Sequence, residues 1–193
     1  MEIIKKEFNF QPYGNIPEGA RLNLGCGRAQ YTNLINIDNN TNLNPDINID
    51  LFNFPYAIEN NSVSFVLMHH FLEHVPKNIY FKFITELNRM CKDSAIIEIF
   101  SPYYTSIRAH QDPTHETPVS EATPVYFSSK WREDCFVEHY LDPKLDWELL
   151  FMDVSLIEPW NKKSDEARQF ALQHYFNVAS DIKIITKVKK NNL

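Results

Sequence analysis

Glycine is scarce in this sequence, and its few glycines are placed unevenly. The chain has four glycines in 193 residues, whereas average usage of about 7% would give about thirteen. Two of the four, Gly25 and Gly27, are separated by a single residue. A chain that avoids glycine elsewhere keeps it here, which indicates a turn that needs the backbone freedom of glycine.

Other absences exclude whole classes of protein. No run approaches 18 consecutive apolar residues, so no transmembrane helix is expected. Residues 1–14 lack the apolar core of a secretory signal. The three cysteines, Cys26, Cys91 and Cys135, are odd in number and widely spaced. A disulfide framework or zinc ribbon is therefore not expected, and a reducing, cytoplasmic setting is favoured.

An excess of positive charge is also missing. The formal net charge is −6, so nothing in the overall charge favours nucleic acid as a partner. The one basic run, residues 183–190, is interpreted as a charged strand edge. The hydrophobic share of 44% and charged share of 23% are ordinary for a globular chain of one domain. We therefore expect a small-molecule substrate, no nucleic acid and no membrane span, while the sequence does not predict the oligomeric state.

Apolar periodicity predicts alternating strands and helices. Residues 76–91 carry one apolar stripe at Ile79, Phe83, Leu87 and Met90, typical of a helix packed on a core. Strands with intervening crossovers indicate a parallel α/β sheet. The expected strands are 21–24, 34–38, 46–50, 62–69, 95–100, 147–157 and 182–188, and further helical segments are expected at 124–129 and 164–175.

The segment from about 102 to 124 has a different character. It contains four prolines and little periodicity. A loop of this length in a small domain is usually functional. We therefore expect it to form the substrate loop of a single domain that spans residues 1–193.

The glycine turn follows a strand and precedes another that ends on a carboxylate. Main-chain N–H groups at such a turn can approach a ligand closely, and an acidic residue at the next strand tip, here Asp38, can bind ribose hydroxyls. The third glycine of a dinucleotide fingerprint is missing, because Gln30 stands in its place. Only thirteen positions separate Gly25 from Asp38, which leaves little room for a crossover helix. Both features disfavour NAD and leave room for another adenosine cofactor, although a structural tight turn is equally consistent with the Gly-x-Gly pattern alone.

The order of motifs resembles the class I (Rossmann-like) S-adenosylmethionine-dependent methyltransferases over roughly residues 20–130. The resemblance implies an α/β, Rossmann-like, doubly wound, mostly parallel seven-stranded sheet with an antiparallel last strand. It also implies S-adenosylmethionine as the cofactor. The motifs are LNLGCG at 22–27, INID at 35–38, the run from Asp46 to Val75 that ends in HHFLEHV, and DPTH at 112–115.

The resemblance also implies roles for individual residues. Asp38 would bind the ribose hydroxyls, and Asp50 would accept from the adenine amino group with Leu51 against the ring. His69 and His70 would lie beside the sulfonium and the substrate. For both aspartates the alternative is a carboxylate that caps a nearby turn. The whole cofactor set is Asn23, Gly25, Cys26, Gly27, Asp38, Asp50, Leu51 and His69.

Methyl transfer to oxygen or nitrogen benefits from a base, and histidine suits neutral pH. His70, Glu73 and His74 would share one face of a helical turn. Zinc would need a further ligand and none is within sequence reach, so we expect no metal. His70 is nearest the strand tip and is the first candidate base, whereas Glu73 and His74 are favoured as a hydrogen-bonded pair that fixes the turn.

The long loop offers a second candidate base. Asp112 and His115 could form a pair in which the carboxylate sets the imidazole tautomer. The alternative is an Asp112 turn before Pro113, with His115 as a loop anchor. Candidate substrate-binding residues are Tyr103, Tyr104, Arg108 and His110, although adjacent tyrosines on an extended strand point opposite ways, so only one would line the pocket.

The sequence thus favours a methyltransferase that acts on oxygen or nitrogen of a small molecule or a sugar-containing metabolite. A non-catalytic S-adenosylmethionine-binding partner or sensor on the same fold is the alternative, since it would keep the glycine turn and the two aspartates. A nicotinamide oxidoreductase is disfavoured by the missing third glycine.

Overall fold

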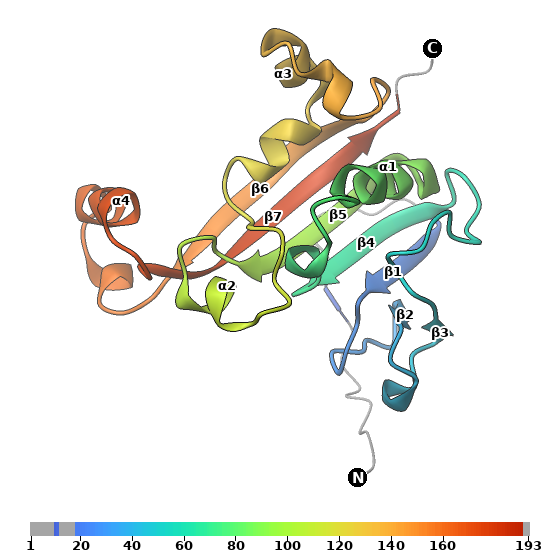
Figure 1. Ribbon diagram of the computed structural model, residues 1–193, viewed down its shortest axis with the longest axis horizontal. Coiled ribbons are helices and arrows are strands. Elements are labelled where there is room, and N and C mark those ends of the chain that lie inside the picture. The colour runs from blue at the N-terminus through green and yellow to red at the C-terminus, as the bar shows by residue number, and fades with distance from the viewer. Residues whose placement is uncertain (1–9, 12–17, 191–193) are drawn as a thin grey trace.

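A computed structural model describes residues 10–11 and 18–190, and it contains one seven-stranded sheet (Figure 1). The strand order is β3-β2-β1-β4-β5-β7-β6, with parallel pairing from β3 to β5 and antiparallel pairing of β7 with both of its neighbours. This confirms the expected α/β architecture. The strands are β1 (Ala20–Leu24), β2 (Ile35–Asp38), β3 (Ile47–Asn48), β4 (Val63–His69), β5 (Cys91–Pro102), β6 (Asp146–Leu156) and β7 (Ala179–Lys189).

The helices are short, and only two α-helices have ten or more residues in the described part of the chain. Figure 1 shows α1 lying across one face of the sheet and α2 near the carboxyl ends of β4 and β5. It shows α4 beyond the end of the sheet at which β6 ends and β7 begins. The α-helices are α1 (Tyr80–Met90), α2 (Ile107–Gln111), α3 (Ser129–Asp134) and α4 (Asp165–His174); the 3₁₀ turns are η1 (Thr41–Leu43), η2 (Leu72–His74), η3 (Thr123–Phe127), η4 (Glu138–Tyr140) and η5 (Trp160–Lys162).

The main core lies between α1 and the sheet. Phe83, Leu87 and Met90 of the expected stripe are completely buried, and Ile79 packs against them from the turn before the helix. A second, smaller cluster that includes Phe65 and Leu67 occupies the other face of the sheet. The helical period of the apolar residues therefore predicted correctly which side of this segment is internal.

The connection between β1 and β2 consists of turns, as the short spacing from Gly25 to Asp38 predicts. The side chain of Asn36 makes several of the hydrogen bonds within this connection. The Asn36 amide donates to the carbonyls of Tyr31 and Leu34 and to Asp46, while its oxygen accepts from the side chain of Asn23 and from the main chain of Tyr31. Asn36 is 4% exposed. A buried amide thus satisfies main-chain groups that a crossover helix would otherwise pair internally.

Element bounds differ from expectation at several places. The helix expected at 76–91 begins at Tyr80, and the last strand, expected at 182–188, begins at Ala179. The fifth strand, expected at 95–100, runs from Cys91 to Pro102. The expected strand at 46–50 shrinks to the two residues of β3. Among the described residues no helix is both long and apolar enough to cross a membrane. The expectation that residues 1–14 hold no secretory signal falls mostly outside the described residues.

Candidate functional site

A cavity of about 300 Å³ opens at the carboxyl ends of β1, β2 and β4. Open α/β sheets bind ligands at this edge, and the volume is at the small end of the range for ligand pockets. The glycine turn, both candidate aspartates and the strand-tip histidine therefore meet in one place. The walls include Gly25, Asp38, Asp50, Leu51, His70 and His74.

The two glycines of the turn are required for different reasons. Both have left-handed backbone angles, with φ of 62° at Gly25 and 51° at Gly27. A Cβ atom at Gly25 would lie 2.1 Å from Cδ2 of Phe71, whereas a Cβ atom at Gly27 would meet nothing within 4 Å. Gly25 thus allows the main chain to pass directly under an aromatic ring that itself lines the cavity.

Each candidate aspartate lines the cavity and also holds its own loop. The Asp38 carboxylate accepts from the Gly27 amide at 2.8 Å and from the Asn40 amide at 2.9 Å. Asp50 accepts from the amide of Phe52 at 2.9 Å. The capping role weighed as an alternative is therefore real. Because each carboxylate oxygen has two lone pairs, capping leaves acceptor capacity for a ligand.

Four residues assigned to the cofactor by resemblance do not line this cavity: Asn23, Cys26, Gly27 and His69. The amide of Gly27 instead donates to Asp38, which does line it. Asn23 is buried, and its amide donates to the Ala29 carbonyl at 2.7 Å. Cys26 is 4% exposed. His69 lines a separate cavity beside Phe100, where burial first, and then the neighbouring His70, lower its pKa below the ordinary value. Their roles in cofactor binding remain predictions.

A second cavity, of about 510 Å³, adjoins the first. His70 and His74 line both cavities. The second cavity is bounded by the turn after β4 and by the long loop, so it is where a substrate could meet a ligand in the first. Its walls include His70, Glu73, His74, Arg108, Asp112 and His115.

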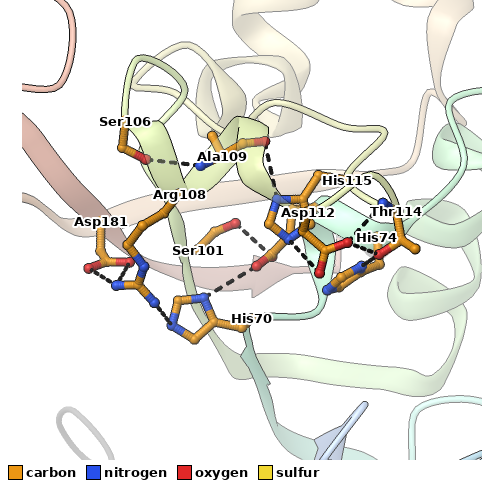
Figure 2. A network of polar contacts seen from close by, with 11 residues as sticks. His70, His74, Ser101, Ser106, Arg108, Ala109, Asp112, Thr114, His115 and Asp181 are labelled. Atoms are coloured by element: carbon orange, nitrogen blue, oxygen red, sulfur yellow. Dashed lines mark hydrogen bonds and ion pairs between the residues drawn. The ribbon is translucent and has the colours of Figure 1, made fainter.

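His70 lies at the boundary of the two cavities and is held from both sides (Figure 2). Its Nδ1 is 3.3 Å from Oε1 of Glu73, and its Nε2 is 3.5 Å from Nη2 of Arg108. Nη1 of Arg108 in turn donates to both carboxylate oxygens of Asp181 in β7, at 2.7 and 2.8 Å. His70 has a left-handed φ of 54°, a conformation that costs a non-glycine residue about 1–2 kcal/mol.

Glu73 is a buried carboxylate, 3% exposed. Burial acts to raise its pKa, but hydrogen bonds with His70 and Ser101 outweigh burial and hold the pKa below its ordinary value. The Ser101 hydroxyl donates to Oε2 at 2.7 Å. The helical turn expected to place His70, Glu73 and His74 on one face is instead a 3₁₀ turn, in which residues three apart eclipse. His70 precedes this turn and pairs with Glu73, whereas His74, inside it, contacts Thr114 of the long loop.

His115 and Asp112 lie together, but not as the expected pair. His115 Nδ1 is 3.2 Å from the Ala109 carbonyl, which can only accept, so this carbonyl sets the tautomer. Asp112 faces the other nitrogen, Nε2, at 4.0 Å. The Asp112 turn is also present: Oδ1 accepts from the amide and hydroxyl of Thr114 at 2.8 and 2.6 Å, and these bonds lower the pKa of Asp112.

Of the four candidate substrate residues, Arg108 lines the second cavity, whereas Tyr103, Tyr104 and His110 line neither of the two. Tyr103 is buried and donates to Glu121 at 2.6 Å. Burial and this carboxylate raise the pKa of Tyr103. His110 bonds to the Tyr104 carbonyl at 3.0 Å. A substrate role for these three remains a prediction.

Sequence reasoning missed several residues of the site. Phe52 and Phe71 stack at 5.9 Å and both line the first cavity. Asp181, which anchors Arg108, is 6% exposed. The aromatic pair could have been suspected from its position directly after two expected strands. The Asp181 contact joins residues 73 positions apart, and no local pattern signals it.

Comparison with solved structures shows the same fold in known enzymes. An S-adenosylmethionine-dependent methyltransferase from Archaeoglobus fulgidus is 20% identical, with 88% of this chain and 86% of that chain covered at a TM-score of 0.56. One from Methanosarcina mazei is 16% identical, with 95% and 100% covered at a TM-score of 0.55. This chain has a methyltransferase fold. The sequence matches no protein-family model and no curated protein, so the comparisons bear on the fold alone.

Proposed function

We propose that this chain is an S-adenosylmethionine-dependent methyltransferase that acts on an oxygen or nitrogen atom of a small molecule or a sugar-containing metabolite. The observation that carries the proposal is the first cavity, which gathers Gly25, Asp38 and Asp50 at the carboxyl edge of a methyltransferase fold. The adjoining cavity supports it, because a methyl donor and an acceptor need neighbouring sites with a shared wall.

The residues present fit the cofactor. Asp38 would bind the ribose hydroxyls with its remaining lone pairs, and Asp50 would accept from the adenine amino group. The buried Leu51 and the stacked rings of Phe52 and Phe71 offer apolar surface for the adenine. When bound, S-adenosylmethionine supplies a methyl group that is already activated on a sulfonium.

The chain itself would position the acceptor and accept its proton. His70 Nε2 faces the second cavity beside Arg108, and His115 presents Nε2 there, because its Nδ1 donates to the Ala109 carbonyl. Either nitrogen could hold the proton that the acceptor loses. The Arg108–Asp181 pair ties α2, in the long loop, to β7.

Calorimetry with S-adenosylmethionine and S-adenosylhomocysteine tests the cofactor site. Asp38→Asn and Asp50→Ala should each weaken binding by about 10- to 100-fold, the worth of one charge-assisted hydrogen bond. Asp153→Ala, an exposed carboxylate on β6, is the matched control and should bind as the parent does. No binding of either compound to the parent chain would refute the proposal.

A screen of metabolites with labelled methyl donor tests turnover. Label transfer that is lost in His70→Ala or His115→Ala, with cofactor affinity kept, would support the proposed base. Cofactor binding without transfer to any acceptor would instead favour a non-catalytic sensor or partner protein.

A further inference from the structure

Three potential metal ligands meet on the floor of the second cavity. Glu73 and His74 come from η2, and His115 comes from the loop some 40 positions later; one potential ligand atom of each lies within 4.8 Å of the others. The loop is fastened to the turn: the amides of Glu116 and Thr117 both donate to the Glu73 carbonyl, at 2.8 and 3.0 Å. The cluster is therefore held in place by main-chain bonds.

Hydrogen bonding gives both histidines the same tautomer. His115 donates through Nδ1 to the Ala109 carbonyl, so its Nε2 carries a lone pair. His74 Nδ1 lies 2.9 Å from Oγ1 of Thr114, and that hydroxyl donates its hydrogen to Oδ1 of Asp112 at 2.6 Å. The hydroxyl must therefore accept from His74, and His74 also carries its lone pair on Nε2. A carbonyl partner on the far nitrogen, as His115 has, is an arrangement that orients metal-binding histidines.

The third member, Glu73, is oriented in the same way. Its two oxygens are held by His70 and by Ser101, and each keeps a lone pair for a further partner. The side chain is almost completely buried. Figure 2 shows the rings of His74 and His115 close together beside Asp112, and their centroids are 4.7 Å apart. A cation bound between two imidazoles and a carboxylate this close together would be attracted by the negative charge of Glu73.

We propose that Glu73, His74 and His115 bind a zinc ion. Two histidines and one carboxylate, with a fourth position open to water or substrate, form a ligand set of catalytic zinc sites. Tetrahedral zinc places its ligand atoms about 3.3 Å apart, so the three groups must close by about 1.5 Å from the present separation of up to 4.8 Å. This reverses the sequence-based expectation of no metal, because the missing ligand comes from the loop.

The position of the proposed ion between the two cavities would give it a role in the reaction. His74 lines both cavities, and the other two ligands line the second. If the proposed methyltransferase function holds, on which this step rests, the open position would take an oxygen atom of the acceptor. A hydroxyl bound to zinc would lose its proton near neutral pH. Because His115 Nε2 would then hold the ion, the proton would pass to His70, which lines both cavities and is not a member of the cluster. The acceptor class would thus narrow to molecules that present an ionisable hydroxyl group.

The test is zinc binding by the untagged full chain, stripped with a chelator and titrated with Zn²⁺ in the absence of S-adenosylmethionine. The parent chain and all variants in this test carry Cys135→Ser, since Cys135 is exposed and could bind zinc by itself. About one zinc per chain is expected, and His74→Ala and His115→Ala should each weaken the affinity by at least about 100-fold. The exposed His139 lies outside the cluster, so His139→Ala should bind zinc as the parent does.

Circular dichroism checks that the variants fold, and His74→Gln and His115→Gln serve in place of any alanine variant that does not. Cobalt substitution gives a second readout, since a tetrahedral Co²⁺ site with nitrogen ligands absorbs visible light and should lose this band in the same variants. A parent chain that binds no zinc, or variants that bind as the parent does, would overturn the site. Because no cofactor is present, the zinc site and the methyltransferase proposal can fail separately.

Discussion

The two glycines of the turn allow a matched experiment on how the cavity wall is built. Gly25→Ala and Gly27→Ala put the same methyl group on two residues with similar left-handed backbone angles, 62° and 51°. For both, the backbone cost is about 1–2 kcal/mol, offset by about 0.4–1 kcal/mol because alanine restricts the unfolded chain. Gly27→Ala, whose new Cβ atom meets nothing, should therefore lower the free energy of unfolding by about 1 kcal/mol.

Gly25→Ala carries an additional packing cost. Its Cβ atom would lie 2.1 Å from a ring carbon of Phe71, where ordinary contact begins at 3.4 Å, so the ring must move by about 1.3 Å. Overpacking of this kind costs about 1–3 kcal/mol. The total loss for Gly25→Ala should thus be about 2–4 kcal/mol, a large fraction of a typical domain stability.

Urea unfolding of the two variants measures the difference, and Phe71→Ala supplies the third corner of a double-mutant cycle. In the Phe71→Ala background the Gly25→Ala substitution should cost only what Gly27→Ala costs, because the ring is gone. Equal destabilisation by the two glycine substitutions in the parent chain would refute the reasoning, as would a cycle with no coupling between Gly25 and Phe71.

Two further predictions concern titratable groups outside the site. The Glu86 carboxylate accepts from Arg89 and from the Tyr56 amide, and the bonds with Arg89 lower its pKa most. Its stabilisation should therefore be complete above the ordinary glutamate pKa of about 4.5 and be lost as the pH falls through the folded-state pKa. Unfolding titrations should accordingly show Glu86→Gln less stable than the parent by about 1–3 kcal/mol at neutral pH and the difference shrinking in acid; a constant difference would contradict this. Burial raises the pKa of Cys91 to about 12, and Cys26 is also buried, whereas Cys135 is exposed. A thiol reagent should therefore modify one cysteine in the native chain and three after unfolding. Rapid modification of Cys91 in the native chain would show that its burial is wrong.

The sequence predicted those parts of the structure that rest on local patterns. The stripe through Phe83 and Leu87 determined the buried side of α1 because helical periodicity acts within a few residues. The spacing from Gly25 to Asp38 correctly excluded a crossover helix between β1 and β2, since the chain is too short to form one there. These features need no knowledge of distant contacts.

The sequence predicted less well which residues meet in the site. The turn after β4 was expected to be helical, but it is a 3₁₀ turn, and His74 contacts Thr114 of the long loop. The meeting of His74 with His115 depends on main-chain bonds from the loop to Glu73, which link positions over 40 residues apart. The tautomer of His115 is set by the Ala109 carbonyl, and main-chain acceptors of this kind leave no mark in the amino-acid pattern.

The single amide of Asn36 has a consequence for how this protein tolerates mutation. In a helix, the pairing of main-chain groups is spread over many residues, and most surface replacements are nearly neutral. Here a buried side chain takes over part of that pairing, because Asn36 contacts Tyr31, Leu34 and Asp46 together. A replacement at Asn36 would leave several buried partners unpaired at once, so this position should tolerate far fewer substitutions than an exposed helical residue.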